Sequence, residues 1–187
     1  MKFKLTPFIA LASVVTVGSG IAVAQHTMDP MVGGHTMSMS KNIVQNAMNS
    51  NDHTTLVAAV KAAGLAPTLE GKGPFTVFAP TNEAFNALPK GTVPMLLKPA
   101  HKAMLVKVLK YHVVPGTITK AQLESKIKAG GGTARLKTVQ GEYLKFRMHG
   151  EGIEVIDAKG NIAHITIYDV RQSNGNIFVV NRVLMPN

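Results

Sequence analysis

The sequence predicts a single α+β domain in which helices come first and antiparallel strands come last. From residue 41 to residue 130, apolar residues recur at helical spacing between residues that cap or break helices. Beyond residue 143, apolar and polar residues alternate, which is typical of half-buried strands. The chain has 187 residues and no cysteine, so burial of an apolar core has to hold this fold together.

Two helices are expected at the start of this domain. Ser40 can cap the first helix, whose apolar residues begin at Ile43. The second helix carries Leu56 and Val60 on one face. It is expected to end at Gly64, because glycine readily adopts the left-handed conformation that closes a helix.

A short strand and two further helices follow. Residues 75–78 form a compact apolar run after the Gly73-Pro74 break, which predicts a strand. Thr81 is a suitable N-cap for a short helix, and Pro99 suits the first turn of a longer one. The helical part of the chain therefore continues past residue 100.

A strand, a turn and one more helix complete the first part. Residues 111–114 are expected to form a strand that ends at the turn dipeptide Pro115-Gly116. Thr119 and Gln122 match a capping box, in which each side chain bonds the main chain at the start of a helix. That helix should end at Gly130.

The last part of the chain is expected to consist of strands at residues 144–148, 153–156, 162–170 and 177–180. Within the third of these, Ile165 and Ile167 should share one face, because alternate residues of a strand point the same way. Asn174-Gly175 predicts a tight hairpin between the last two strands.

The N-terminus indicates export. Lys2 and Lys4 precede an apolar run at residues 8–17, and Ala22-Val23-Ala24 offers small residues where a signal peptidase cuts. A membrane anchor is the alternative, but the apolar run is shorter than the ~20 residues that span a bilayer. Residues 1–24 are therefore predicted to be a signal peptide, and the mature protein to be periplasmic or secreted.

Residues 25–40 are rich in methionine and histidine and show no periodicity, so we expect a disordered linker before a domain at residues 41–187. Thioether sulfur and imidazole are ligands that copper accepts. The alternative is a flexible spacer. The weak metal-ligand candidates are His26, Met28, Met31, His35, Met37 and Met39.

Three ordered motifs resemble those of the fasciclin-like domain family: FTVFAPTNEAF at 75–85, Tyr111-His112 within LKYHVVPG, and SNGNIFVV at 173–180, followed by Val183, Leu184 and Pro186. The resemblance extends from residue 41 to residue 186. It implies a fasciclin-like fold with two small β-sheets of about seven strands, packed as a wedge or sandwich, with helices covering one side. It also implies an extracellular role in adhesion.

The resemblance implies candidate site residues as well. Tyr111, His112, Asp169 and Val170 occupy places that are implicated in partner binding in animal relatives. A buried, hydrogen-bonded role is the alternative for the first two. The residues of the structural motifs are Thr81, Asn82, Asn174 and Gly175. Phe178 and Asn181 stand where the family often has histidine and aspartate, so roles of those side chains do not carry over.

The charge balance suggests an anionic partner. The formal net charge is +10, and residues 90–147 hold 12 basic residues against two acidic ones. Polysaccharide fits an exported protein better than nucleic acid does; an ordinary solvated surface is the alternative. The anion-binding candidates are Lys98, Lys102, Lys107, Lys110, Lys126, Lys128, Arg135, Lys137, Lys145 and Arg147.

The sequence contains no HExxH, GxSxG or phosphate-loop motif and no cysteine nucleophile. We therefore expect that the protein is not an enzyme and binds no cofactor. The prediction is a secreted adhesion or matrix-interaction module that binds a cell-surface or matrix protein or an anionic polysaccharide. The alternative is a periplasmic copper-binding or stress-related protein that acts through residues 25–40.

Overall fold

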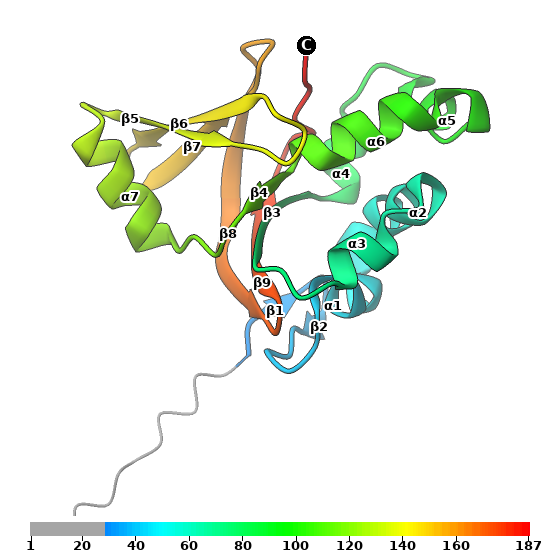
Figure 1. The fold of residues 1–187 in the computed structure, drawn as a ribbon, viewed down its shortest axis with the longest axis horizontal. Helices are drawn as coiled ribbons and strands as arrows, with labels where there is room; N and C mark the ends of the chain where they lie inside the picture. The colour runs from blue at the N-terminus through cyan, green and yellow to red at the C-terminus, as the bar shows by residue number, and fades with distance from the viewer. Residues whose placement is uncertain (1–28) are drawn as a thin grey trace, which may run out of the picture.

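The computed structural model describes residues 29–187, so the expected signal peptide and the candidates His26 and Met28 lie outside the described residues. Seven strands form one hydrogen-bonded order, β4-β3-β9-β8-β7-β6-β5. A layer of helices lies to one side of it, and α7 lies apart at the left of Figure 1. The α+β class is confirmed.

The helices are α1 (Ile43–Asn49), α2 (Thr54–Ala63), α3 (Ala66–Glu70), α4 (Asn82–Asn86), α5 (Thr92–Leu96), α6 (Lys102–Tyr111) and α7 (Lys120–Ala129), with 3-10 turns η1 (Asn51–His53) and η2 (Pro99–His101). The sheet strands are β3 (Phe75–Pro80), β4 (Val113–Pro115), β5 (Thr133–Lys137), β6 (Tyr143–His149), β7 (Gly152–Ile156), β8 (Ile162–Gln172) and β9 (Gly175–Val180). A separate hairpin pairs β1 (Met31–Val32) with β2 (His35–Thr36).

The long strand β8 divides the sheet into two parts. Its first residues pair with β7, whereas the rest of it pairs with β9 across two register shifts. The two sheets that the resemblance implied are therefore two parts of one hydrogen-bonded order, and they share β8. The pairing of β3 with β9 is parallel, and the other pairs of the sheet are antiparallel.

Two apolar cores lie on opposite faces of β3 and β9. Helices α1 to α6 cover the first core, to which β3 contributes Val77 and β9 contributes Val179. The second core is enclosed between the two parts of the sheet and α7. In this second core the ring of Phe78 lies 5.3 Å from that of Phe146 and 5.5 Å from that of Phe178. The central strands are therefore buried on both faces.

Most helix ends agree with the sequence predictions. Gly64 closes α2 in the left-handed conformation, Thr81 caps α4, and Thr119 and Gln122 form the capping box of α7. The start of α1 differs, because Asn42 and not Ser40 is its cap. Asn42 takes this place because its side chain accepts from Gln45 N–H while the Gln45 side chain accepts from Asn42 N–H.

Three strand predictions need correction. Tyr111 is the last residue of α6, and β4 begins only at Val113, because the amphipathic helix continues through the motif. Ile165 lies in the enclosed core whereas Ile167 packs against the helix-side core, because a register shift separates them. In the β8–β9 hairpin, Gln172 pairs with Gly175, so the loop residues are 173 and 174.

Residues 29–40 are ordered, in contrast to the linker that composition predicted. Val32 and Met37 are buried in the helix-side core. The hairpin is also held by the main chain, since Asn51 N–H donates to Gly33 O at 3.2 Å and Met37 N–H donates to Pro30 O at 2.9 Å. Burial of these two apolar side chains stabilises the hairpin, although the polar composition of the segment did not predict it.

Candidate functional site

His112 of the Tyr-His motif is buried at the end of α6. Its Nδ1 lies 2.8 Å from Val108 O, and its Nε2 lies 3.0 Å from the main-chain nitrogen of Leu184. A carbonyl only accepts and an amide only donates, so Nδ1 carries the proton and Nε2 accepts. Burial lowers the pKa of His112 to about 4. His112 is thus a neutral bridge between α6 and the segment after β9.

Tyr111 is fully buried in the enclosed core. Its hydroxyl donates to Tyr143 O at 3.0 Å, which ties α6 to the start of β6. Burial raises the pKa of Tyr111 to about 12.

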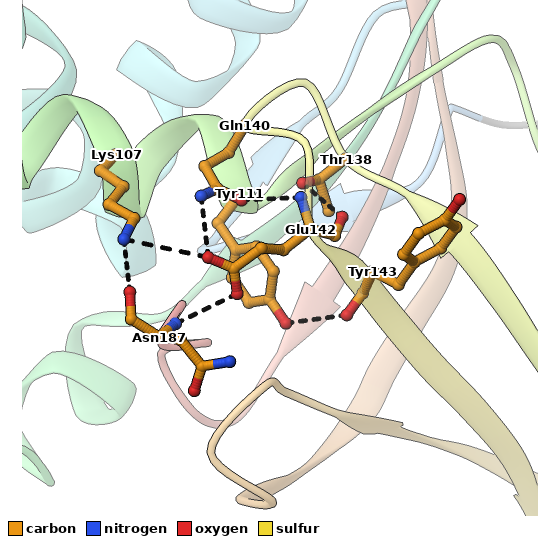
Figure 2. A network of polar contacts seen from close by, with 7 residues as sticks. All are labelled: Lys107, Tyr111, Thr138, Gln140, Glu142, Tyr143 and Asn187. Carbon is orange, nitrogen blue, oxygen red and sulfur yellow. Dashed lines mark hydrogen bonds and ion pairs between the residues drawn. The ribbon is translucent and has the colours of Figure 1, made fainter.

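A polar network around Glu142 joins the β5–β6 turn to α6 and to Asn187 (Figure 2). Glu142 accepts from Gln140 Nε2 at 3.0 Å and from Asn187 N–H at 3.1 Å, and Lys107 Nζ lies 3.9 Å from its Oε1. Thr138 Oγ1 donates to Glu142 O at 2.9 Å. These contacts hold the turn that positions β5 and β6.

Asp169 and Val170 also have structural contacts. Asp169 has a positive φ of 53°, a conformation that aspartate tolerates better than most residues. Its carboxylate accepts from Lys120 N–H at 2.9 Å, at the start of α7, and from Asn176 Nδ2 at 3.0 Å. Val170 is 1% exposed.

For Tyr111 and His112, the structure agrees with the alternative stated above, a buried and hydrogen-bonded role, and not with direct contact to a partner. The side chains of Tyr111, His112 and Val170 are buried because they connect helices and strands of the core, and a partner cannot reach them in this conformation. Only Asp169 is partly exposed.

The other motif residues hold the main chain. Asn82 accepts from Thr55 N–H at 3.0 Å and donates to Asn51 O at 2.8 Å, which joins α4 to the start of α2. Asn174 is buried and bonds Ile43 N–H and Leu69 O. Any side chain at Gly175 would collide with β3, because a Cβ there would lie 2.0 Å from Phe75 O.

The metal-ligand candidates do not come together as a set. Met37 is buried in the apolar core, so its sulfur is not available to an ion from solvent. Met31, His35 and Met39 are exposed. Among residues 29–187, no group of three or more potential His, Cys, Asp or Glu ligands is arranged to hold a metal ion.

The basic candidates fall into three groups. Lys98, Lys102, Lys107 and Lys110 lie on or just before α6, in the helix layer, and Lys126 and Lys128 lie on α7. Figure 1 places these helices on opposite sides of the sheet. The third group comprises Arg135, Lys137, Lys145 and Arg147 of β5 and β6. A single anion-binding face made of all ten residues is excluded.

The third group forms a compact surface, which we call the basic face. Arg135 and Lys137 of β5 are exposed, as are Lys145 and Arg147 of β6, because each alternates with an inward-facing core residue. Arg135 pairs directly with Lys145 across the two strands, and Lys137 pairs with Tyr143. The guanidinium of Arg135 lies 5.0 Å from the centre of the Tyr143 ring.

A buried carboxylate borders the basic face. Glu154 of β7 lies beside Arg147 in the sheet register and is 3% exposed. Arg147 Nε donates to its Oε2 at 2.6 Å, and His149 Nδ1 lies 3.2 Å and His164 Nδ1 3.9 Å from its Oε1. The hydrogen bond from Arg147 holds the pKa of Glu154 below its ordinary value.

Sequence reasoning did not single out Tyr143 or Glu154. Tyr143 could have been found from the alternation of apolar and polar residues along 143–149, because this alternation places its ring on the same face as Lys145 and Arg147. Glu154 joins the site through cross-strand pairing of β6 with β7. That register cannot be read from either strand alone.

Comparison with known proteins agrees with this geometry. The model of the Fasciclin domain family matches residues 51–186. Protein sll1483 of Synechocystis is 41% identical over 180 residues, which is 96% of this chain and 88% of that protein. Immunogenic protein MPB70 of Mycobacterium bovis is 30% identical over 163 residues, which is 84% of this chain and 76% of that protein.

A solved structure shares the fold. The FAS1 domain pair of the insect cell adhesion molecule Fasciclin I has a TM-score of 0.61 and 16% identity. The match covers 78% of this chain and 51% of that one, so this chain spans about half of the pair. Between residues 29 and 187, none of the helices has the length and apolar composition that a bilayer crossing requires.

Proposed function

This chain belongs to the fasciclin domain family, and we propose that it is an exported adhesion module that binds anionic polysaccharide through its basic face. The fold relative that is a cell adhesion molecule supports the adhesive role. The N-terminal sequence, which has the pattern of a signal peptide, supports export.

The basic face is the observation that carries the proposal. Residues 135, 137, 145 and 147 are cationic, and none of the outward-facing residues of 133–137 and 143–149 is acidic. Arg147 is paired with Glu154 of the next strand, so Arg135, Lys137 and Lys145 carry most of the positive charge of the face. Arg135 and Lys145 are directly opposite each other on neighbouring strands. Like charges in this arrangement repel each other and destabilise a sheet. An anion bound between them would relieve this repulsion.

A polysaccharide suits the face better than a compact anion does. The cations occupy successive outward positions of two rigid strands, so they form a surface and not a point. Tyr143 is 46% exposed beside them, and its ring offers apolar surface to a sugar ring. Acidic groups repeated along a polymer could then meet several cations at once.

The buried polar groups support a binding module and not an enzyme. His112 and Asp169 bond main-chain atoms, and so does Asp157, which accepts from Lys159 N–H at 3.0 Å and from Met185 N–H at 3.0 Å. Groups engaged in this way position the chain and are not free to exchange protons with a substrate. A copper-binding role gains no support, because Met37 is buried.

Binding to immobilised alginate tests the proposal. The affinity of the mature protein should fall steeply from about 0.05 M to about 1 M salt, because salt shortens the Debye length from above 10 Å to about 3 Å. The variant Lys137→Gln/Lys145→Gln should lose most of the binding. The matched control Lys98→Gln/Lys102→Gln removes equal charge from the helix side and should bind like the wild type.

Two outcomes would contradict the proposal. Binding that is insensitive to salt would exclude the electrostatic mechanism. Equal losses in the two double variants would mean that net charge, and not the basic face, attracts the polymer.

A further inference from the structure

A hollow of about 840 Å³ lies where the edge strand β5 faces α7 and β4. It is formed by residues 114, 115, 117 and 118, by one side of α7, and by residues 135–137 and 143. Among the strands of residues 29–187, β5 pairs with β6 alone and β4 pairs with β3 alone, so both strands are edges of the sheet. Main-chain groups along an edge strand are available to a ligand.

The hollow has cationic walls and an apolar floor. Lys126 of α7 lines it on one side, and Arg135 and Lys137 of β5 line it on the other. No acidic residue is among its lining residues within the described chain. The buried residues Val114, Ile118 and Leu136 contribute apolar surface, and the polar residues Thr117, Gln122 and Ser125 contribute hydroxyl and amide groups.

A second hollow, of about 710 Å³, provides the contrast. Arg135 and Tyr143 line both hollows, so this pair of side chains stands between them. The second hollow also contains Lys145, Glu142 and Asp157, so its lining carries charges of both signs. The charged residues that line the hollow beside α7 are all cationic, which makes that hollow the stronger anion site of the two.

Arg135 is held in position to bind a carboxylate. Its guanidinium carbon lies 5.0 Å from the centre of the Tyr143 ring, a cation–π contact that holds the side chain beside the hollow. A guanidinium can donate two parallel hydrogen bonds to one carboxylate. Lys126 adds a second charge from the opposite wall.

We propose that the hollow beside α7 is a binding site for one uronate unit of an acidic polysaccharide. A uronate combines a carboxylate, several hydroxyl groups and an apolar ring face, and these correspond to the cations, the polar groups and the floor of the hollow. The inference rests on the proposed function and names the sugar class that the basic face recognises. A polymer anchored in the hollow would continue past Arg135 onto the basic face.

The test uses the full mature chain and three short probes: the trisaccharide of galacturonic acid, the neutral trisaccharide maltotriose, and a triglutamate peptide. The uronate should bind measurably by calorimetry or NMR, and maltotriose and triglutamate should bind at least several-fold more weakly. Lys126→Gln should weaken uronate binding about 2- to 5-fold, as expected for one exposed charge pair. Lys128→Gln is the matched control, because Lys128 is exposed on α7 but does not line the hollow.

These measurements distinguish a failure of the uronate site from a failure of the proposed function. Equal effects of Lys126→Gln and Lys128→Gln, or triglutamate binding as tight as uronate binding, would overturn the uronate site even if alginate still bound the basic face. If alginate fails to bind while the uronate binds in a Lys126-dependent way, the proposed function fails and the site stands.

Discussion

The end of α6 and the basic face are both rich in polar groups, yet they use them in opposite ways. At the end of α6, Tyr111 and His112 are buried, and their polar atoms bond the main chain. On the basic face, Arg135 and Lys145 point to solvent. The two regions meet where the Tyr111 hydroxyl donates to Tyr143 O (Figure 2).

From this contrast we infer that the Tyr-His motif contributes to the stability of the fold. A buried polar group costs stability when its partner is lost, whereas an exposed cation can be replaced with little effect on folding. Substitutions in the first region should therefore lower the free energy of unfolding. Those in the second should change binding alone.

The largest effect is expected for His112→Ala. The change leaves a cavity and deprives Leu184 N–H and Val108 O of their partner. We expect a loss of about 4 kcal/mol in the free energy of unfolding, measured by urea denaturation. A loss below about 1 kcal/mol would contradict the bridging role of this residue.

Acid should destabilise the protein through the same residue. The pKa of His112 is about 4 in the folded protein, against an ordinary value of 6.5, so the unfolded chain binds the proton more readily. The stabilising contribution is complete above pH 6.5 and is lost as the pH falls towards 4, by about 3 kcal/mol.

His112→Gln should remove that contribution and flatten the dependence of unfolding free energy on pH. His53, whose pKa is also lowered by burial, remains in this variant and accounts for residual sensitivity to acid. An unchanged slope between pH 6.5 and 4 would show that His112 is not the source.

A smaller effect is expected for Tyr111→Phe, which joins the two regions. The substitution keeps the buried ring and removes one hydrogen bond, to Tyr143 O. The expected loss is about 1 kcal/mol, measured by denaturation. Affinity for alginate should stay the same; a fall in affinity greater than in Lys145→Gln would mean that this bond shapes the basic face.

The smallest effect on stability is expected for Lys145→Gln. Lys145 is exposed and lies opposite Arg135, so its loss relieves a like-charge contact. The free energy of unfolding should change by less than about 0.5 kcal/mol, while affinity for alginate falls about 2- to 5-fold. Unchanged affinity, with the fold intact, would remove Lys145 from the binding surface.

Local patterns predicted the elements whose signals lie within a few residues. The capping box at Thr119 and Gln122 and the stop at Gly64 are interactions within one turn, so the sequence contains all of their parts. Tyr111 and His112 were assigned to a strand instead, because β propensity favours a run of aromatic and β-branched residues. Packing of α6 overrides that preference.

The candidate site was predicted only in part. Alternation along residues 143–149 identifies Lys145 and Arg147 as neighbours on one face. It does not show that Arg135 lies opposite Lys145, or that α6, which begins at Lys102, and α7 lie on opposite sides of the sheet. Likewise, the polar composition of residues 25–40 did not predict that Val32 and Met37 are buried in the helix-side core.

The family, the α+β class, most helix ends and the excess of positive charge are all predictable from the amino-acid sequence, because they depend on motifs, on composition and on contacts close along the chain. The burial of the Tyr-His motif, the position of Glu154 beside Arg147 and the division of the cations into three groups are visible in the folded chain alone. Burial and strand register arise from contacts between segments far apart in the sequence, and no local pattern contains them.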